Sequence, residues 1–141
     1  MKPRVLIVCT GNSCRSQMAE GLLRHFSKGQ FEVESAGTHP SFVHPLSIKV
    51  MKEIGIDISH HTSKSVEQFI DEQFDYVITV CDSARESCPY FPNAKKRLHI
   101  PFEDPVTSWG DEEKRMDKFR EVRDQIKEKI QELSPRLQSG D

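Results

Sequence analysis

The chain has 141 residues, of which 35% are hydrophobic and 30% charged, and its formal net charge is -2. This length and composition suit one globular domain with a single core. The small negative charge gives no electrostatic reason to bind nucleic acid or anionic membranes, and no apolar run approaches the ~20 residues of a membrane span. An anionic substrate would therefore need a local positive site.

Strand and helix patterns alternate along the first half of the chain. The β-branched run Val5–Val8 predicts a buried strand that leads directly into Cys9. Apolar residues at helical spacing then predict a helix from Ser13 to about Ser27. The next expected elements are a strand over 31–35, a helix over 45–55 and a short helix over 63–70.

The second half continues the alternation. A third strand is predicted over 76–80, followed at once by Cys81, and a fourth over 97–100. Apolar residues at intervals of three or four, from Met116 to Leu133, predict a long amphipathic helix that starts near Asp111. Residues 134–141, which include Pro135, are expected to form a loose tail. The fold class is therefore α/β, one domain over 1–141 with a four-stranded parallel sheet flanked by helices.

Four cysteines need an interpretation: Cys9, Cys14, Cys81 and Cys88. The N-terminus lacks the pattern of a signal peptide, so a cytoplasmic protein with reduced thiols is expected. Catalysis, metal binding or redox exchange then become the main candidate roles. Since ligands of parallel α/β sheets bind beyond the carboxyl ends of strands, Cys9 and Cys81 should lie near one site.

The segment after the first strand has the pattern of an anion cradle. Because Cys9 ends a strand and a helix begins a few residues later, backbone N–H groups and the helix dipole point at one spot. Gly11 would permit unusual backbone angles, and Arg15 would bind two oxygens of a tetrahedral anion. The same donors favour a thiolate at Cys9, to which Ser16 would donate a hydrogen bond. The predicted anion-binding residues are Thr10, Gly11, Asn12, Ser13, Cys14 and Arg15.

A turn of small residues with an inert cysteine would explain Cys9 alone, but not the whole pattern of strand, Cys, five residues, Arg, Ser and helix. The stretch Cys9–Glu20 resembles the active-site loop of the low-molecular-weight tyrosine phosphatase superfamily. Its branches include phosphatases and thioredoxin-coupled arsenate reductases. Gln17, where the phosphatases typically have Pro, and the pair Cys81 and Cys88 favour the reductase branch.

The resemblance implies a relay of three cysteines. Cys9 would attack arsenate, Cys81 would attack Cys9 and release arsenite, and Cys88 would move the disulfide to Cys81–Cys88 for reduction by thioredoxin. Phosphate and sulfate would compete with arsenate for the loop. Cys81 and Cys88 are seven residues apart, about 10 Å along a continuous helix, so a helical segment would have to unwind partly to form the bond.

The resemblance also assigns a general acid and a cation site. Asp104, stiffened by Pro105, would protonate the departing oxygen, whereas Val106 stands where the phosphatases usually place a Tyr that walls the substrate ring. Some reductases of this branch bind potassium through residues matching Asn12, Glu20 and Ser35 and an acidic residue. Lys64 stands at the acidic position here, so no metal or other cofactor is expected. His61 would either join the network around the loop or be an ordinary surface histidine.

Several alternatives remain open. A tyrosine phosphatase or phosphomonoesterase would use the same Cys9, Arg15 and Asp104. A non-enzymatic thiol sensor or arsenite binder would use only Cys81 and Cys88, which could also be ordinary packing residues. A zinc site formed by Cys81, Cys88 and a histidine is a further alternative, although the cysteine spacing is not one of the usual short ones. No nucleic acid, membrane or second subunit is expected as a partner.

Overall fold

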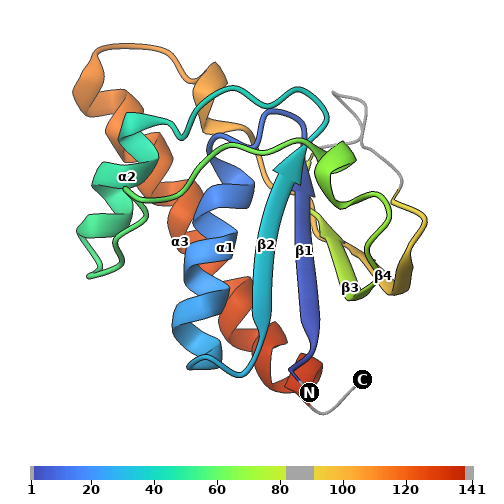
Figure 1. Cartoon of the computed structure of the whole chain (residues 1–141). Coiled ribbons are helices and arrows are strands. Elements are labelled where there is room, and N and C mark those ends of the chain that lie inside the picture. Colours follow the sequence, from blue (N-terminus) through green and yellow to red (C-terminus); the bar gives the residue numbers. More distant parts are fainter. Residues whose placement is uncertain (1, 82–90, 139–141) are drawn as a thin grey trace.

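A computed structural model describes residues 2–81 and 91–138 (Figure 1). Its four strands are β1 (Arg4–Cys9), β2 (Glu32–Gly37), β3 (Phe74–Thr79) and β4 (Ala94–His99). Its α-helices are α1 (Arg15–Ser27), α2 (Pro45–Lys52) and α3 (Glu112–Gln138), and two 3-10 turns are η1 (Val66–Phe69) and η2 (Pro105–Thr107). The predicted short helix over 63–70 is thus only a 3-10 turn, capped by the Ser65 side chain.

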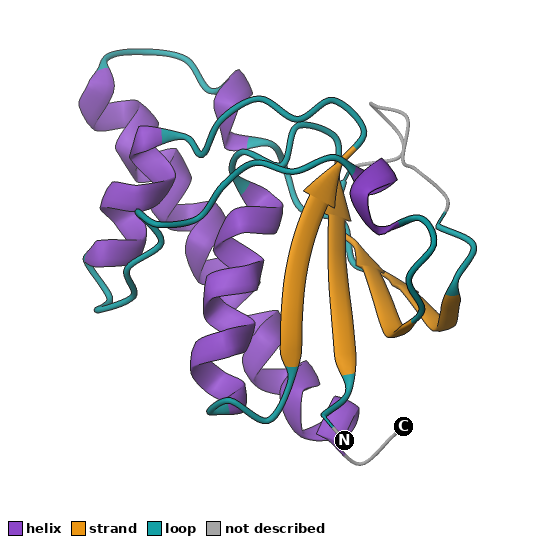
Figure 2. Cartoon of the chain, in the orientation of Figure 1, coloured by secondary structure: helices purple, strands orange, loops and turns teal. Residues whose placement is uncertain are grey.

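The strands form one parallel sheet in the order β2-β1-β3-β4, which confirms the predicted fold class. Figure 2 shows the long helices on one side of the sheet and mostly loop and η1 on the other. Alternation along β1 serves both layers, because Val5 and Ile7 join the larger core under the helices while Leu6 and Val8 join a smaller core with Phe74. All four of these β1 side chains are fully buried, which matches the continuous apolar run expected of a central parallel strand.

The end of α3 contradicts the predicted loose tail over residues 134–138, and residues 139–141 lie outside the described part of the chain. The helix continues through Pro135 to Gln138, and Leu137 is only 1% exposed. The Tyr76 hydroxyl donates a hydrogen bond to the Leu137 carbonyl over 3.4 Å. Leu137 lies four residues after Leu133 and extends the apolar stripe of α3, and burial of this side chain offsets the helical hydrogen bond that Pro135 cannot make.

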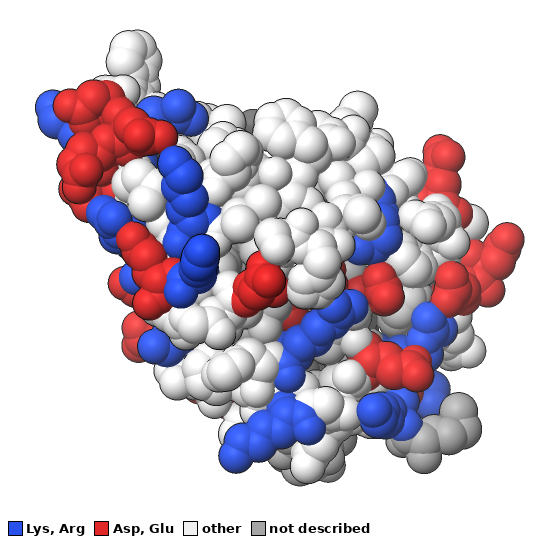
Figure 3. Space-filling model, turned by 60° about the vertical axis from the view of Figure 1, so that its left-hand side comes forward, with Lys and Arg blue, Asp and Glu red and all other residues white. Residues whose placement is uncertain are grey.

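Charged side chains form ion pairs between the helices, and positive and negative side chains are mixed on the surface. On the face drawn in Figure 3, Lys and Arg are interspersed with Asp and Glu. Glu53, just after α2, accepts from Arg120 at 2.8 Å and from Arg123 at 2.7 Å, and both arginines belong to α3. None of the helices in 2–81 and 91–138 combines the length with the apolar character that a membrane span requires.

Candidate active site

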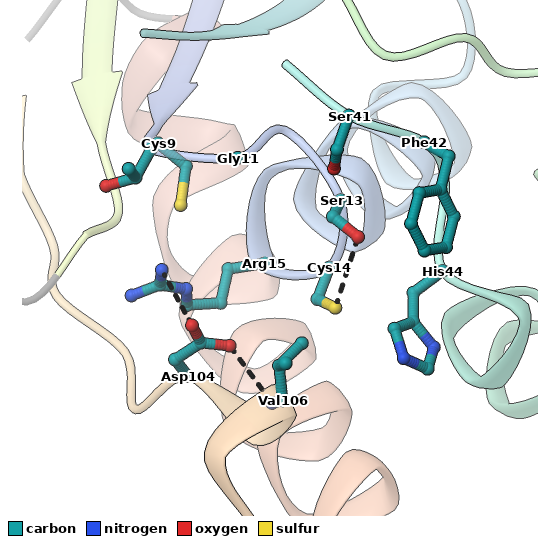
Figure 4. A pocket seen from close by; sticks show the side chains of 11 residues that line it. Cys9, Gly11, Ser13, Cys14, Arg15, Ser41, Phe42, His44, Asp104 and Val106 are labelled. Atoms are coloured by element: carbon teal, nitrogen blue, oxygen red, sulfur yellow. Dashed lines mark hydrogen bonds and ion pairs between the residues drawn. The ribbon is translucent and has the colours of Figure 1, made fainter. Parts of the chain in front are cut away.

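A cavity of about 340 Å³ opens at the carboxyl end of β1, beside the start of α1 (Figure 4). Three segments that are distant in sequence line it: the loop that runs from the end of β1 into α1, the stretch before α2, and the loop around η2. The lining residues are Cys9, Thr10, Gly11, Ser13, Cys14, Arg15, Ser41, Phe42, His44, Asp104 and Val106. The structure therefore brings most of the predicted loop residues to one cavity, together with Asp104.

Three predicted groups converge in this cavity. The Cys9 sulfur points to the same space as the Arg15 guanidinium and the Asp104 carboxylate (Figure 4). Arg15 is 3% exposed; its guanidinium donates to the Phe102 carbonyl at 3.2 Å and lies 3.6 Å from an Asp104 oxygen. Asp104 also caps η2 by accepting from the Val106 N–H at 3.0 Å. The arginine is thus fixed at its far end, while its charge faces the cavity.

The backbone of the loop differs from the prediction at Gly11. Gly11 has no positive φ, and a Cβ there would meet nothing closer than 3.9 Å, so the expected need for glycine is wrong. Asn12 instead adopts the left-handed conformation, with φ of 48°. The glycine that the loop requires is Gly37, at the end of β2, where a Cβ would lie 2.4 Å from the Thr10 carbonyl oxygen.

Asn12 is held by a buried network that the sequence did not reveal in full. Its side-chain amide donates to the hydroxyls of Ser16 at 2.8 Å and Ser35 at 2.9 Å. Its side-chain oxygen accepts from the Lys64 backbone N–H at 2.8 Å and from the Gln17 amide at 3.0 Å. Every polar group of the Asn12 side chain is therefore satisfied, which offsets the cost of its left-handed backbone.

Cys14, like Cys9, is buried and forms no disulfide. Burial is the main cause that raises the pKa of the Cys14 thiol to about 12, and the nearby Ser47 and Ser13 hydroxyls oppose this rise more weakly. Cys14 therefore stays a neutral thiol at neutral pH. Because only the thiolate is nucleophilic, Cys14 is a poor nucleophile. Its place in the cavity wall agrees with a binding rather than a reacting role.

Cys81 lies near Cys9 across paired strands. The Val80 N–H donates to the Val8 carbonyl at 2.9 Å, so Cys9 and Cys81 follow bonded neighbours at the same edge of the sheet. Cys81 is fully buried and takes part in a disulfide. Cys88 and the predicted unwinding of its segment fall in 82–90, outside the described residues, and remain predictions.

The potassium-like position is occupied by a lysine side chain. The Lys64 ammonium lies 3.9 Å from an oxygen of Glu20 and 3.7 Å from Glu34, and it donates to the Thr62 carbonyl at 3.2 Å. Arg24 also pairs with Glu20, at 2.9 Å. Since the carboxylate already faces two cations, these residues do not fit a potassium ion. Within 2–81 and 91–138, no group of three or more His, Cys, Asp or Glu is arranged to hold a metal.

Sequence reasoning missed part of the cavity wall. Ser41, Phe42 and His44 line it, and the Phe42 ring lies 6.2 Å from the stacked His44 ring. Although Val106 stands where the phosphatases usually place a Tyr, Phe42 supplies an aromatic ring to the cavity wall. No local pattern signals this role, because Phe42 comes from a loop whose course is set by tertiary contacts such as that between the Ser63 hydroxyl and the Ser41 N–H.

Comparisons with known proteins agree with this geometry. A family model for low molecular weight phosphotyrosine protein phosphatase matches residues 4–140. An arsenate reductase of Halalkalibacterium halodurans is 43% identical over 92% of this chain and 93% of its own length. A solved arsenate reductase in the phosphate binding state superposes with a TM-score of 0.80 at 38% identity, covering 96% of this chain and 98% of its own. A thioredoxin-dependent arsenate reductase of Corynebacterium glutamicum superposes at 0.73 and 29% identity, over 99% of this chain and 64% of its own.

Proposed function

From the premise that this chain belongs to the low molecular weight phosphotyrosine protein phosphatase family, we propose that it is an arsenate reductase, which converts arsenate to arsenite. The observation that carries the proposal is the second thiol position: Cys81 follows the strand paired with the one that ends at Cys9. Phosphoester hydrolysis needs one nucleophilic cysteine, whereas reduction of As(V) by thiols must collect two electrons. We infer that the substrate is arsenate because the relatives named above are arsenate reductases.

The first step joins arsenate to Cys9. The loop N–H groups and the Arg15 guanidinium bind three oxygens of the tetrahedral anion, and the Cys9 thiolate attacks arsenic opposite the fourth. The departing oxygen is the hydroxyl of hydrogen arsenate, so one proton from Asp104 lets it leave as water. An S–As bond forms and an As–O bond breaks, so arsenic remains As(V). Ser16, whose oxygen already accepts from Asn12, has its hydroxyl proton available for the Cys9 sulfur.

The second step reduces arsenic. The Cys81 thiolate attacks the Cys9 sulfur; an S–S bond forms, the S–As bond breaks, and its electron pair stays on arsenic, which leaves as arsenite. Cys88 then attacks Cys81 and returns Cys9 to its thiolate form. A thioredoxin dithiol reduces the resulting Cys81–Cys88 disulfide, which places the proposed cycle in the reducing cytoplasm. Phosphate and sulfate bind the same cradle and compete with arsenate.

Disulfide mapping tests this cycle. Reduced protein is mixed with arsenate and analysed by mass spectrometry, as wild type and as Cys88→Ser. The relay predicts Cys81–Cys88 in the wild type and a trapped Cys9–Cys81 disulfide in the variant. Sulfate in place of arsenate is the control, since it binds without accepting electrons. Absence of any arsenate-dependent disulfide would defeat the reductase proposal and leave the phosphatase or the arsenite binder.

A second activity is favoured by the size and lining of the cavity. About 340 Å³ is roughly ten times the ~30 Å³ of one water, and Phe42 and Val106 add apolar wall beyond the oxyanion position. We propose a minor phosphomonoesterase activity that uses the same Cys9 attack, with water ending the cycle. It predicts slow release of p-nitrophenol from p-nitrophenyl phosphate that persists in Cys81→Ser but is lost in Cys9→Ser.

A further inference from the structure

The buried contacts around Gln17 point to a group that the cycle above does not use. Gln17 is fully buried in the first turn of α1, directly behind the anion loop. Its amide nitrogen lies 3.1 Å from the Asn12 carbonyl, 3.0 Å from the Asn12 side-chain oxygen and 3.0 Å from the Thr62 carbonyl. All three neighbours only accept hydrogen bonds, so this end of the Gln17 amide must be the NH₂ group.

The opposite end of the amide then needs a donor. The Gln17 side-chain oxygen lies 2.9 Å from Nδ1 of His61. Because an amide oxygen cannot donate, Nδ1 of His61 must carry the proton, which fixes the tautomer. Burial is the main cause that lowers the pKa of His61 to about 4, with the Arg24 charge second, so the ring is neutral at pH 7 and its one proton is committed to Gln17.

The His61 side chain is well placed for such a duty. It is 3% exposed, and its other ring nitrogen lies 3.7 Å from a Glu20 oxygen, too far for a hydrogen bond. Glu20 in turn accepts from the Ser35 hydroxyl, and Ser35 accepts from Asn12. Nδ1 is therefore the ring atom that acts on the network.

We propose that His61 is a positioning residue that, through its Nδ1–H, fixes the orientation of the Gln17 amide and thereby holds Asn12 in the conformation that aims the loop N–H groups at the oxyanion. If the Gln17 amide rotates by half a turn, its oxygen faces the two Asn12 oxygens and the Thr62 carbonyl. Four acceptors would then face one another in a buried space with no donor between them, which is strongly unfavourable. The proposal deepens the arsenate reductase function above and rests on it for its turnover readout.

The test compares three substitutions. His61→Leu removes the donor, His61→Gln keeps an N–H that can reach Gln17, and Gln17→Met removes the amide while keeping the side-chain length. His60→Leu is the matched control, because this neighbouring ring is exposed and lies 4.8 Å from His61. The measurements are the dissociation constant of inorganic phosphate by calorimetry, KM and kcat for arsenate with thioredoxin, and the melting temperature.

The positioning role predicts about tenfold weaker phosphate binding and a similar rise in arsenate KM for His61→Leu and for Gln17→Met, with kcat changed less than threefold. The double variant should bind no more weakly than either single one, since both break the same contact. His61→Gln should recover to within about threefold of the wild type.

Other outcomes overturn the proposal. A lower melting temperature with unchanged phosphate affinity in His61→Leu would make the residue merely structural, and so would equal losses in His61→Leu and His61→Gln. Phosphate binding does not depend on reduction. A wild type that binds phosphate yet leaves arsenate unreduced would therefore sink the proposed function, while the phosphate affinities of the His61 variants would still support or refute the positioning role.

Discussion

Replacement of Lys64 tests whether a side-chain ammonium stands where some relatives use a potassium ion. The ammonium lies 3.9 Å from Glu20, whose side chain is 2% exposed, whereas Lys64 itself is 16% exposed. Coulomb attraction at this distance is about 4 kcal/mol at an effective dielectric constant of 20 and about 1 kcal/mol in water. Since desolvation and side-chain ordering oppose it, we expect a net loss of about 1–2 kcal/mol in Lys64→Met.

That loss corresponds to a fall in melting temperature of roughly 3–7 °C for a domain of this size. Lys64→Asp should fall further, because it places a third carboxylate near Glu20 and Glu34. Added potassium should then bind this variant. At ten times its dissociation constant the ion restores about 1.4 kcal/mol, or roughly 5 °C.

The assay is melting temperature and arsenate turnover with 0 or ~100 mM potassium chloride, with choline chloride keeping the ionic strength constant. Added potassium should change the turnover of the wild type and of Lys64→Met by less than twofold, and their melting temperatures by less than about 2 °C. Tenfold activation of the wild type by potassium, or a Lys64→Asp variant indifferent to the ion, would refute the reasoning.

Four further predictions concern single positions. Gly37→Ala should lose about 2 kcal/mol or more of stability and most phosphate affinity, checked by melting and calorimetry, because its Cβ would lie 2.4 Å from the Thr10 carbonyl oxygen. Arg15→Lys should lower kcat/KM for arsenate by about 10²–10³, since an ammonium cannot hold the Phe102 carbonyl and two anion oxygens together. Iodoacetamide at pH 7 should alkylate Cys9 well before Cys14, as judged by peptide mass spectrometry, because burial raises the Cys14 pKa to about 12. The His61 pKa is about 4 in the folded chain, against the ordinary value of 6.5 that we take for the unfolded chain. Between pH 4 and pH 6.5 the unfolded state therefore binds more protons than the folded state. The free energy of unfolding should therefore fall by up to about 3 kcal/mol from pH 6.5 to 4, and less in His61→Gln, in denaturant titrations at each pH.

The parts of the fold and site that follow local patterns were predictable from the sequence. The apolar run before Cys9 predicts the central strand. The position of Cys9, at the end of this strand and shortly before a helix, predicts the anion cradle. Arg15 joins this cradle through its spacing from Cys9, because five intervening residues bring the first turn of the helix back over the loop. Asp104 required the family resemblance, since an Asp-Pro pair alone is also an ordinary turn.

The features that depend on contacts between distant segments were not predictable. The sequence predicts that the loop needs a glycine at position 11, but the residue that must lack a side chain is Gly37, because the neighbouring strand passes close to the Thr10 carbonyl there. Phe42 reaches the cavity from a loop that has no periodic pattern. Pro135 suggested a helix end, yet burial of Leu137 against the sheet outweighs the lost hydrogen bond.

The attachments of Asn12 make the anion site a product of complete folding. Its partners at Ser35 and Lys64 lie 23 and 52 residues further along the chain, so neither β1 nor its following loop can form the cradle alone. A partly folded chain therefore has no affinity for oxyanions, and any oxyanion acts as a folding ligand that stabilises only the native state. Phosphate at one hundred times its dissociation constant would add about 2.7 kcal/mol to the free energy of unfolding. Cellular phosphate would thus stabilise the folded enzyme when arsenate is absent. The stability measured in vitro should likewise depend on the choice of buffer anion.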